Sequence, residues 1–295
     1  MTKWFLLAAF FPISTYGQLQ RFSFTQPKMG SYFTITFYDN DSAHATKQVN
    51  ECFTLVDSLN EIYSDYIPGS ELNRLSTTAG KNKWVKVSAA LLDILIESQH
   101  AWKLSEGAFD ITVGPLVRLW RRARKENKFP DKDSIAILLK ATGFQYILID
   151  TVNNRVQLTK PSMQLDLGGI GQGYMAQKVL DHLANNNIKI ALVDASGDIV
   201  TGNSPPGKQG WRIAVNVPES TAELLDKQII VHHKAVITSG DVYQYISHDG
   251  KKYSHIIDPK TGYGVTNQRN ATIIAGDGIT ADWLATTCTI LSIEK

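Results

Sequence analysis

The sequence is poor in cysteine, in unbalanced charge and in long apolar runs. Only Cys52 and Cys288 occur in 295 residues, which excludes a disulfide framework. The net charge is only +2 and the largest basic cluster is confined to residues 118–125, so nucleic acid is not the indicated partner. No apolar run reaches the roughly 20 residues that cross a bilayer. The mature chain is therefore not expected to span a membrane, although association with a membrane surface stays open.

The N-terminal 17 residues have the features of a secretory signal peptide. An apolar run at residues 4–13 is followed by a small polar stretch at 14–17, and a lysine precedes the run. We therefore expect an exported, periplasmic protein that is cleaved before Gln18. With 43% hydrophobic residues, the remaining residues 18–295 can bury a full core, as a single domain or as two interleaved subdomains.

The order of apolar patterns predicts an α+β fold with mixed sheets and flanking helices. Residues 29–39 alternate as a half-buried strand does, and Ser42 and Ser88 each precede an amphipathic helix. Strands dominate the second half, which also contains a helix at about 173–183 and another near the C-terminus. The strands expected in that half cover residues 146–150, 156–158, 164–167, 190–193, 211–217, 228–237, 253–257 and 271–275.

The most informative segment is QLDLGGIGQGYMAQKVLDHL, in which four glycines separate a strand end at Asp166 from a helix. Glycine lets the backbone approach a ligand closely, and a helix N-terminus offers unpaired N–H groups to phosphate oxygens. The spacing matches neither the dinucleotide fingerprint nor the P-loop. A tight structural turn explains the segment equally well.

Two further segments carry groups suited to catalysis. TADWLATT places Asp282 and Thr286 one helical turn apart, where a carboxylate and a hydroxyl can bind Mg²⁺. The alternative is a helix N-cap and a packed threonine. KKYSHIIDPKTG delivers His255 to a strand end, ahead of Asp258 and a turn, and histidine can accept a proton near neutral pH. A structural histidine is the alternative there.

Other polar and aromatic groups fit either a ligand or ordinary packing. Thr238, Ser239 and Asp241 stand at a strand end, where they can line an anion site or form a turn. In AFDIT, the Asp110 carboxylate can bind a ribose hydroxyl or an amine, and the Tyr66 ring can stack on flavin or adenine. Capping and packing explain these residues as well.

Taken together and in order, the segments resemble the FAD:protein FMN transferase family, often called ApbE. The matching strings cover residues 29–287 and are MGSYFTITFY, YSDYIPGSELNRLS, GAFDITVGPLVRLW, LDLGGIGQGYMAQKV, DASGDI, ITSGDVYQY, DGKKYSHIIDPKTG and ADWLATT. The resemblance implies an ApbE/T-fold-like architecture and one FMN transferase catalytic domain. It also implies that FAD is cleaved and that FMN is attached through a phosphoester bond to a threonine or serine of an acceptor flavoprotein, with release of AMP.

The resemblance also assigns residues. It implies a Mg²⁺ site at Asp282, Thr286 and a main-chain oxygen of Gly171. His255 would act as general base, and Asp258 would support that region. Flavin and adenine contacts would fall on Met29, Tyr66, Ala108, Phe109, Asp110, Gln172 and His255. Position 172 departs from the lysine that is frequent in the family.

Two alternatives use the same residues. Attack by water would make the protein an FAD pyrophosphatase that releases FMN and AMP. A non-catalytic FAD-binding protein would need the aromatic and glycine-rich segments but not the metal and base residues. The joint presence of Asp282, Thr286 and His255 favours an enzyme.

Overall fold

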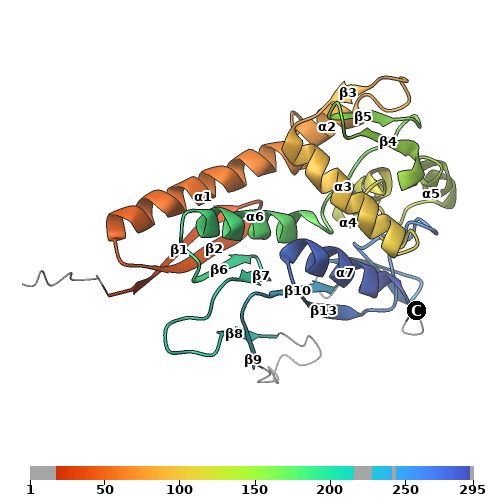
Figure 1. Cartoon of the computed structure of the whole chain (residues 1–295). Helices are drawn as coiled ribbons and strands as arrows, with labels where there is room; N and C mark the ends of the chain where they lie inside the picture. Colours follow the sequence, from red (N-terminus) through yellow and green to blue (C-terminus); the bar gives the residue numbers. More distant parts are fainter. Residues whose placement is uncertain (1–17, 216–227, 241–243, 293–295) are drawn as a thin grey trace, which may run out of the picture.

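A computed structural model describes residues 18–215, 228–240 and 244–292 (Figure 1). The predicted signal peptide and Asp241 lie outside these residues. Within them, helices pack on sheets whose ladders are all antiparallel, and the only parallel pairing is an isolated bridge between Val113 and Gln164. The predicted α+β fold with flanking helices is confirmed.

A six-stranded sheet forms the base of the molecule, with the order β1-β2-β6-β7-β10-β13. Strands β1 and β6 alternate between more and less exposed side chains, as expected where helices cover one face of the sheet. The strands are β1 (Gln20–Lys28), β2 (Ser31–Asp39), β6 (Ala191–Ala195), β7 (Asp198–Thr201), β10 (Ala235–Gly240) and β13 (Asn270–Ala275).

Three helices lie on that covered face (Figure 1). They are α1 (Ser42–Tyr63), α6 (Gly171–Asn185) and α7 (Gly278–Ile290). Their apolar sides share one core with the sheet, which includes Val56 of α1, Val179 of α6 and Ala281 of α7. Burial of these side chains stabilises the layer, at roughly 25 cal/mol per Å² of apolar surface.

Most of the remaining elements pack at one end of this layer (Figure 1). Tyr63, Phe109 and Tyr174 belong to its main core, so α1 and α6 contribute to both cores. Its helices are α2 (Glu71–Ser76), α3 (Ala89–Leu104), α4 (Gly114–Glu126), α5 (Lys132–Leu139) and the short 3-10 helix η1 (Phe144–Tyr146). Its strands are β3 (Val85–Lys86), β4 (Ile147–Asp150) and β5 (Arg155–Leu158), and a hairpin pairs β11 (Tyr245–His248) with β12 (Lys251–Ser254). The pair of β8 (Trp211–Ala214) and β9 (Gln228–Val231) lies instead on the other face of the six-stranded sheet, where Trp211 and Ile213 share a small core with Val236 of β10 (Figure 1).

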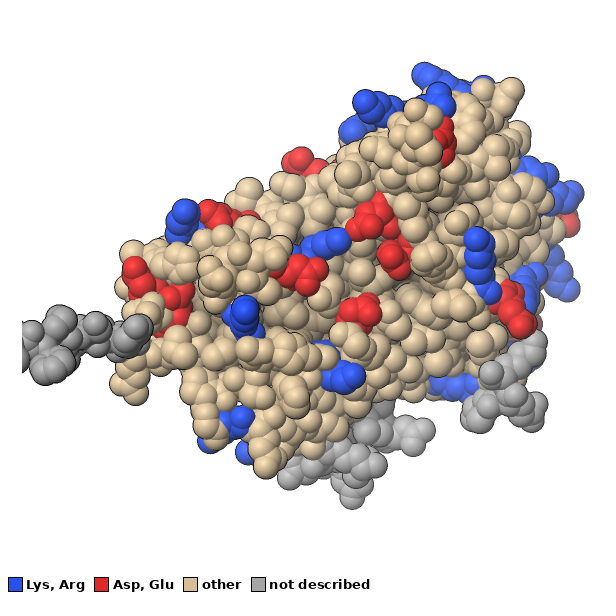
Figure 2. Space-filling model, in the orientation of Figure 1, with Lys and Arg blue, Asp and Glu red and all other residues tan. Residues whose placement is uncertain are grey.

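The surface carries charges of both signs. On the face drawn in Figure 2, lysine and arginine lie among aspartate and glutamate, and no continuous basic area forms. Among the residues described, no helix combines the length and apolar character that a membrane crossing requires.

Several element boundaries differ from the sequence-based prediction. Asp41, and not Ser42, caps α1, because its carboxylate accepts the N–H groups of Ala43 and His44. Residues 228–237 contain β9 and the start of β10, separated by a turn in which His233 has a positive φ of 49°. Within residues 253–257, strand β12 ends at Ser254, and Ile257 forms only an isolated bridge with Gly264.

The segment 164–167 is not a strand of any sheet. It forms one bridge between Gln164 and Val113, and the Asp166 N–H donates to the Ile111 carbonyl at 2.8 Å. The chain there is extended and tied to a single neighbouring segment. The first strand, β1, was not predicted.

Helices α6 and α7 come into backbone contact near their N-termini. A Cβ on Gly173 would overlap the carbonyl oxygen of Gly278 and lie 2.7 Å from the Cβ of Asp282. A Cβ on Gly278 would in turn overlap the carbonyl oxygen of Gly173 and lie 2.9 Å from Val200. Only glycine at both positions allows the helices to approach this closely.

Gly278→Ala should therefore destabilise the fold. The added methyl group meets main-chain atoms that cannot rotate away, and overpacking of this kind costs about 1 to 3 kcal/mol. The free energy of unfolding, measured with urea, should fall accordingly. Gly276→Ala is the matched control, because no atom lies within 4 Å of its Cβ position. Equal stability of the two variants would contradict a close helix contact.

Candidate active site

The glycine loop, residues 168–173, lies directly against helix α7. The Gly173 N–H donates to Asp282 Oδ2 at 2.9 Å. A Cβ on Gly169 would lie 3.0 Å from the Thr286 hydroxyl and 3.2 Å from the Phe109 ring. The structure thus brings the loop, Asp282 and Thr286 together, as the sequence-based hypothesis requires.

This contact changes the role of the helix N-terminus. Helix α6 has no side-chain cap of its own at Ile170, and the Asp282 carboxylate of α7 accepts the N–H of Gly173 instead. The sequence alone suggested that this N–H group is open to phosphate. In the structure it is occupied by a protein carboxylate. Asp282 is also not the N-cap of its own helix, since Asp277 caps α7.

The main-chain position beside Thr286 is Gly169. Gly171, which was predicted to supply a metal ligand, begins α6 and donates its N–H to the Leu167 carbonyl at 2.8 Å. Its Cβ position meets only Leu167, at 3.8 Å. Gly169 is thus a candidate ligand that the sequence analysis missed. The sequence alone does not distinguish the four glycines, because it does not show which of them lies beside α7.

Two buried carboxyl groups, those of Asp282 and Asp198, lie near the glycine loop. Burial raises the pKa of Asp282 to about 7. Burial, followed by repulsion from Asp282 and Asp194, raises the pKa of Asp198 well above its usual value. Among the described residues, no lysine or arginine forms an ion pair with Asp282 or Asp198. A bound cation would supply the missing positive charge.

The donor set suits Mg²⁺ better than a metal that needs several ionisable ligands. In the described part of the chain, no group of three or more His, Cys, Asp or Glu side chains could hold a metal. Mg²⁺ needs only one or two carboxylates and keeps its remaining positions for water and phosphate oxygens. Asp282, the Thr286 hydroxyl and a carbonyl of the glycine loop therefore fit this ion.

Tyr66 is connected to the glycine loop through Arg121 on α4. The Arg121 guanidinium lies 4.0 Å from the centre of the Tyr66 ring and 2.8 Å from Asp65 Oδ2. It also lies 3.7 Å from Asp166 Oδ2, and the other oxygen of Asp166 accepts the Gly168 N–H at 2.8 Å. Sequence analysis identified neither Arg121 nor Asp166 as part of the site.

The AFDIT segment is fixed by internal hydrogen bonds. Both oxygens of Asp110 are used, because Oδ1 accepts the N–H and the hydroxyl of Thr112 and Oδ2 accepts the Phe144 N–H. Burial raises the pKa of this carboxyl group. Ala108 and Phe109 are also buried. The side chain of Asp110 thus holds the segment in place, and a ligand would meet the segment mainly through its backbone.

Two predicted contact residues occupy distinct positions. Met29 forms the β1–β2 turn, with a positive φ of 55°, and its half-buried side chain packs on both main cores. Gln172 is half-buried in the first turn of α6, next to the Gly173 N–H that Asp282 accepts.

His255 lies just beyond β12, and its N–H donates to the Gln244 carbonyl at 2.8 Å. Within the described residues, its buried Nδ1 has no hydrogen-bond partner. Burial, followed by repulsion from Arg124 of α4, lowers the pKa of His255 to about 4. The ring is therefore neutral at pH 7 and able to accept a proton.

Asp258 stabilises the turn that follows His255. Its two oxygens accept the Lys260 N–H at 2.9 Å and the Thr261 hydroxyl at 3.0 Å. The turn is held against α4 because Trp120 Nε1 donates to the Gly262 carbonyl at 2.9 Å. This geometry agrees with a supporting role for Asp258.

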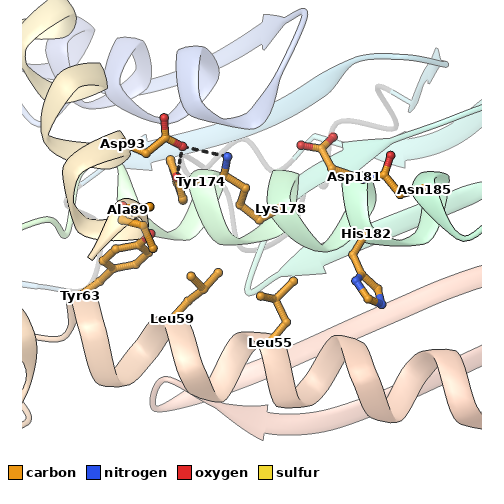
Figure 3. A pocket seen from close by; sticks show the side chains of 11 residues that line it. Leu55, Leu59, Tyr63, Ala89, Asp93, Tyr174, Lys178, Asp181, His182 and Asn185 are labelled. Atoms are coloured by element: carbon orange, nitrogen blue, oxygen red, sulfur yellow. Dashed lines mark hydrogen bonds and ion pairs between the residues drawn. The ribbon is translucent and has the colours of Figure 1, made fainter. Parts of the chain in front are cut away.

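A cleft of about 580 Å³ between α1 and α6 lies apart from these residues (Figure 3). None of the predicted site residues lines it. Several of its polar side chains already have protein partners, because Lys178 and Tyr174 both donate to Asp93 and His182 lies 3.4 Å from Glu51. The cleft therefore gives no reason to move the candidate site.

Solved structures of flavin transferases share this fold. The apo form of the flavinyl transferase ApbE from Pseudomonas stutzeri matches with a TM-score of 0.83 and 28% sequence identity, over 94% of this chain and 86% of that chain. The flavin transferase ApbE from Vibrio cholerae matches with a TM-score of 0.80 and 28% identity, over 92% and 87%.

Sequence comparison gives the family. A protein of Haemophilus influenzae called FAD:protein FMN transferase is 31% identical over 276 residues, which are 90% of this chain and 80% of that protein. A protein of the same name from Klebsiella pneumoniae is 29% identical over 93% of this chain and 84% of its own length. The profile of the ApbE family matches residues 29–295, and the chain belongs to this family.

The low pKa of His255 predicts a pH-dependent loss of stability. In the unfolded chain the His255 ring binds a proton below about pH 6.5, whereas in the folded chain it does so only near pH 4. Stability is therefore complete above about pH 6.5 and falls toward pH 4, by about 2 kcal/mol at pH 5. The free energy of unfolding should be measured with urea at pH 7 and pH 5 for the wild type and for His255→Gln. Only the wild type should lose stability at pH 5 through this residue. A His255 ring that titrates near pH 6.5 by NMR would exclude it.

Proposed function

We propose that the protein is a Mg²⁺-dependent FAD:protein FMN transferase, which attaches FMN to a threonine or serine hydroxyl of an acceptor flavoprotein. The names of the related proteins suggest the reaction. One observation of the structure carries the proposal. The glycine loop meets both Asp282, through the Gly173 N–H, and Thr286, beside Gly169. This is the place where a dinucleotide phosphate and a metal ion can be held together.

In this proposal, FAD lies across the residues gathered around the glycine loop. The exposed Tyr66 ring offers a face for the flavin or the adenine, and the Phe109 ring borders the loop. Met29, Ala108, Asp110 and Gln172 complete the proposed contacts. Asp110 would contribute by fixing the backbone, since both of its oxygens are already bonded.

Asp282, Thr286 and a main-chain oxygen of the glycine loop, at Gly169 or Gly171, would hold Mg²⁺. When bound, the ion would neutralise phosphate charge and act as a Lewis acid during the transfer. The buried Asp282 and Asp198 carboxylates lack a cationic partner among the described residues, and this supports the assignment.

The residues of the chain then support a direct phosphoryl-type transfer. The acceptor hydroxyl oxygen bonds to the phosphorus of the FMN half, the bond from that phosphorus to the AMP oxygen breaks, and AMP leaves. The hydroxyl proton goes to the neutral His255 ring, whose low pKa keeps it unprotonated at pH 7. Asp258 and Trp120 hold the turn that follows this ring. Positioning and electrostatics provide most of the rate in such transfers.

We further propose that the protein is exported and acts on flavoproteins that face the periplasm. The composition of residues 1–17 supports export. The test of the function uses residues 18–295 incubated with FAD, Mg²⁺ and a flavin-accepting domain, with the mass of that domain measured afterwards. Transfer adds one FMN minus one water and releases AMP. An unmodified domain beside free FMN would indicate an FAD pyrophosphatase, and unchanged FAD would indicate a binding protein.

Asp282→Asn should remove the activity without unfolding the protein. The amide oxygen can still accept the Gly173 N–H, so the contact between α6 and α7 is retained, but the negative charge for the ion is lost. We expect turnover to fall about 100-fold or more and its dependence on Mg²⁺ concentration to weaken. Asp181→Asn is the control, as an exposed carboxylate on α6. Wild-type turnover in Asp282→Asn would remove this residue from the metal site.

A further inference from the structure

Tyr66 is an exposed aromatic ring with only one supported face. The ring is 72% exposed, so it contributes little to any core. The Arg121 guanidinium lies 4.0 Å from the ring centre, at a distance typical of a cation–π contact. Burial therefore does not explain why the ring is held, and one of its faces is supported by a cation.

Arg121 is itself anchored on two nearly buried carboxylates. Its guanidinium lies 2.8 Å from Asp65 and 3.7 Å from Asp166, whose side chains are only 10% and 11% exposed. Asp65 immediately precedes Tyr66, and Asp166 accepts the N–H of Gly168 in the glycine loop. One guanidinium thus links the exposed ring to the loop that we propose holds the phosphates of FAD.

We propose that Arg121 is a positioning residue for FAD: it supports one face of Tyr66, so that the other face stacks on an aromatic ring of the dinucleotide at a set place relative to the glycine loop. This inference rests on the proposed function. Arginine suits the task because its planar group stacks on a ring and pairs with carboxylates at the same time, whereas lysine provides only a point charge.

A purely structural role would give a different pattern of effects. If Arg121 only neutralised Asp65 and Asp166, its loss would lower stability and would affect FAD binding equally with and without the Tyr66 ring. If it acts through Tyr66, the effect on FAD binding disappears once the ring is removed. A double-mutant cycle separates the two roles, because residues that act through one another are not additive.

The experiment measures the FAD dissociation constant by flavin fluorescence, without Mg²⁺ so that no turnover occurs, in the wild type, Arg121→Gln, Tyr66→Ala and the double variant. We expect Arg121→Gln to weaken FAD binding about 10-fold in the wild-type background and less than about 2-fold in the Tyr66→Ala background. In the transferase assay, the KM for FAD should rise while kcat stays within about 2-fold. Arg122→Gln, at an exposed position on the same helix, should bind FAD as the wild type does.

Arg121→Lys keeps the experiment informative if Arg121→Gln does not fold. It retains the charge beside Asp65 but lacks the planar stack, and we expect FAD binding about 3-fold weaker at unchanged melting temperature. Wild-type affinity in Arg121→Lys, or an equal loss from Arg121→Gln in both backgrounds, overturns the inference while the proposed function stands. Failure of the wild type itself to bind FAD overturns both.

Discussion

The contact between Gly173 of α6 and Gly278 of α7 is the constraint on which the candidate site depends. With no side chain at either position, the two helices approach until their backbones touch. Only at this separation can the Asp282 carboxylate accept the Gly173 N–H and the Thr286 hydroxyl lie beside Gly169. The glycines therefore act first through helix packing, and the site follows from that packing.

The same packing creates an electrostatic problem that a ligand can solve. It buries Asp282 close to Asp198, and burial raises the pKa of both carboxyl groups. A buried carboxylate without a cationic partner is unfavourable, because the protein interior solvates charge poorly. The Gly173 N–H compensates only part of this cost. A divalent cation would provide a direct attraction for both carboxylates, so metal binding and local stability are expected to be coupled.

Local patterns in the sequence predicted much of the fold and identified Asp282, Thr286 and the glycine loop, which the structure brings together. The α6 and α7 helices follow from apolar spacing, and Asp282 and Thr286 from their separation of one turn. The hydrogen bond between Gly173 and Asp282 joins residues 109 positions apart, so no local pattern could report it. The same limit hid Arg121, whose role depends on neighbours from two distant segments, Asp65–Tyr66 and Asp166. Strand β1 was missed although Phe22 and Phe24 alternate with polar residues and pack against the sheet core.

Helix α4 connects the two ends of the site. Trp120 donates to the Gly262 carbonyl and so holds the turn that follows His255, while the adjacent Arg121 pairs with Asp65 and supports Tyr66. Neighbouring residues on a helix point about 100° apart, so one turn of α4 contacts both the turn that follows the proposed base and the proposed stacking ring. The separation between the two is then set by a helix and not by a loop. In a reaction that depends on positioning, this rigid support would hold the dinucleotide ring and the proposed proton acceptor at a fixed separation.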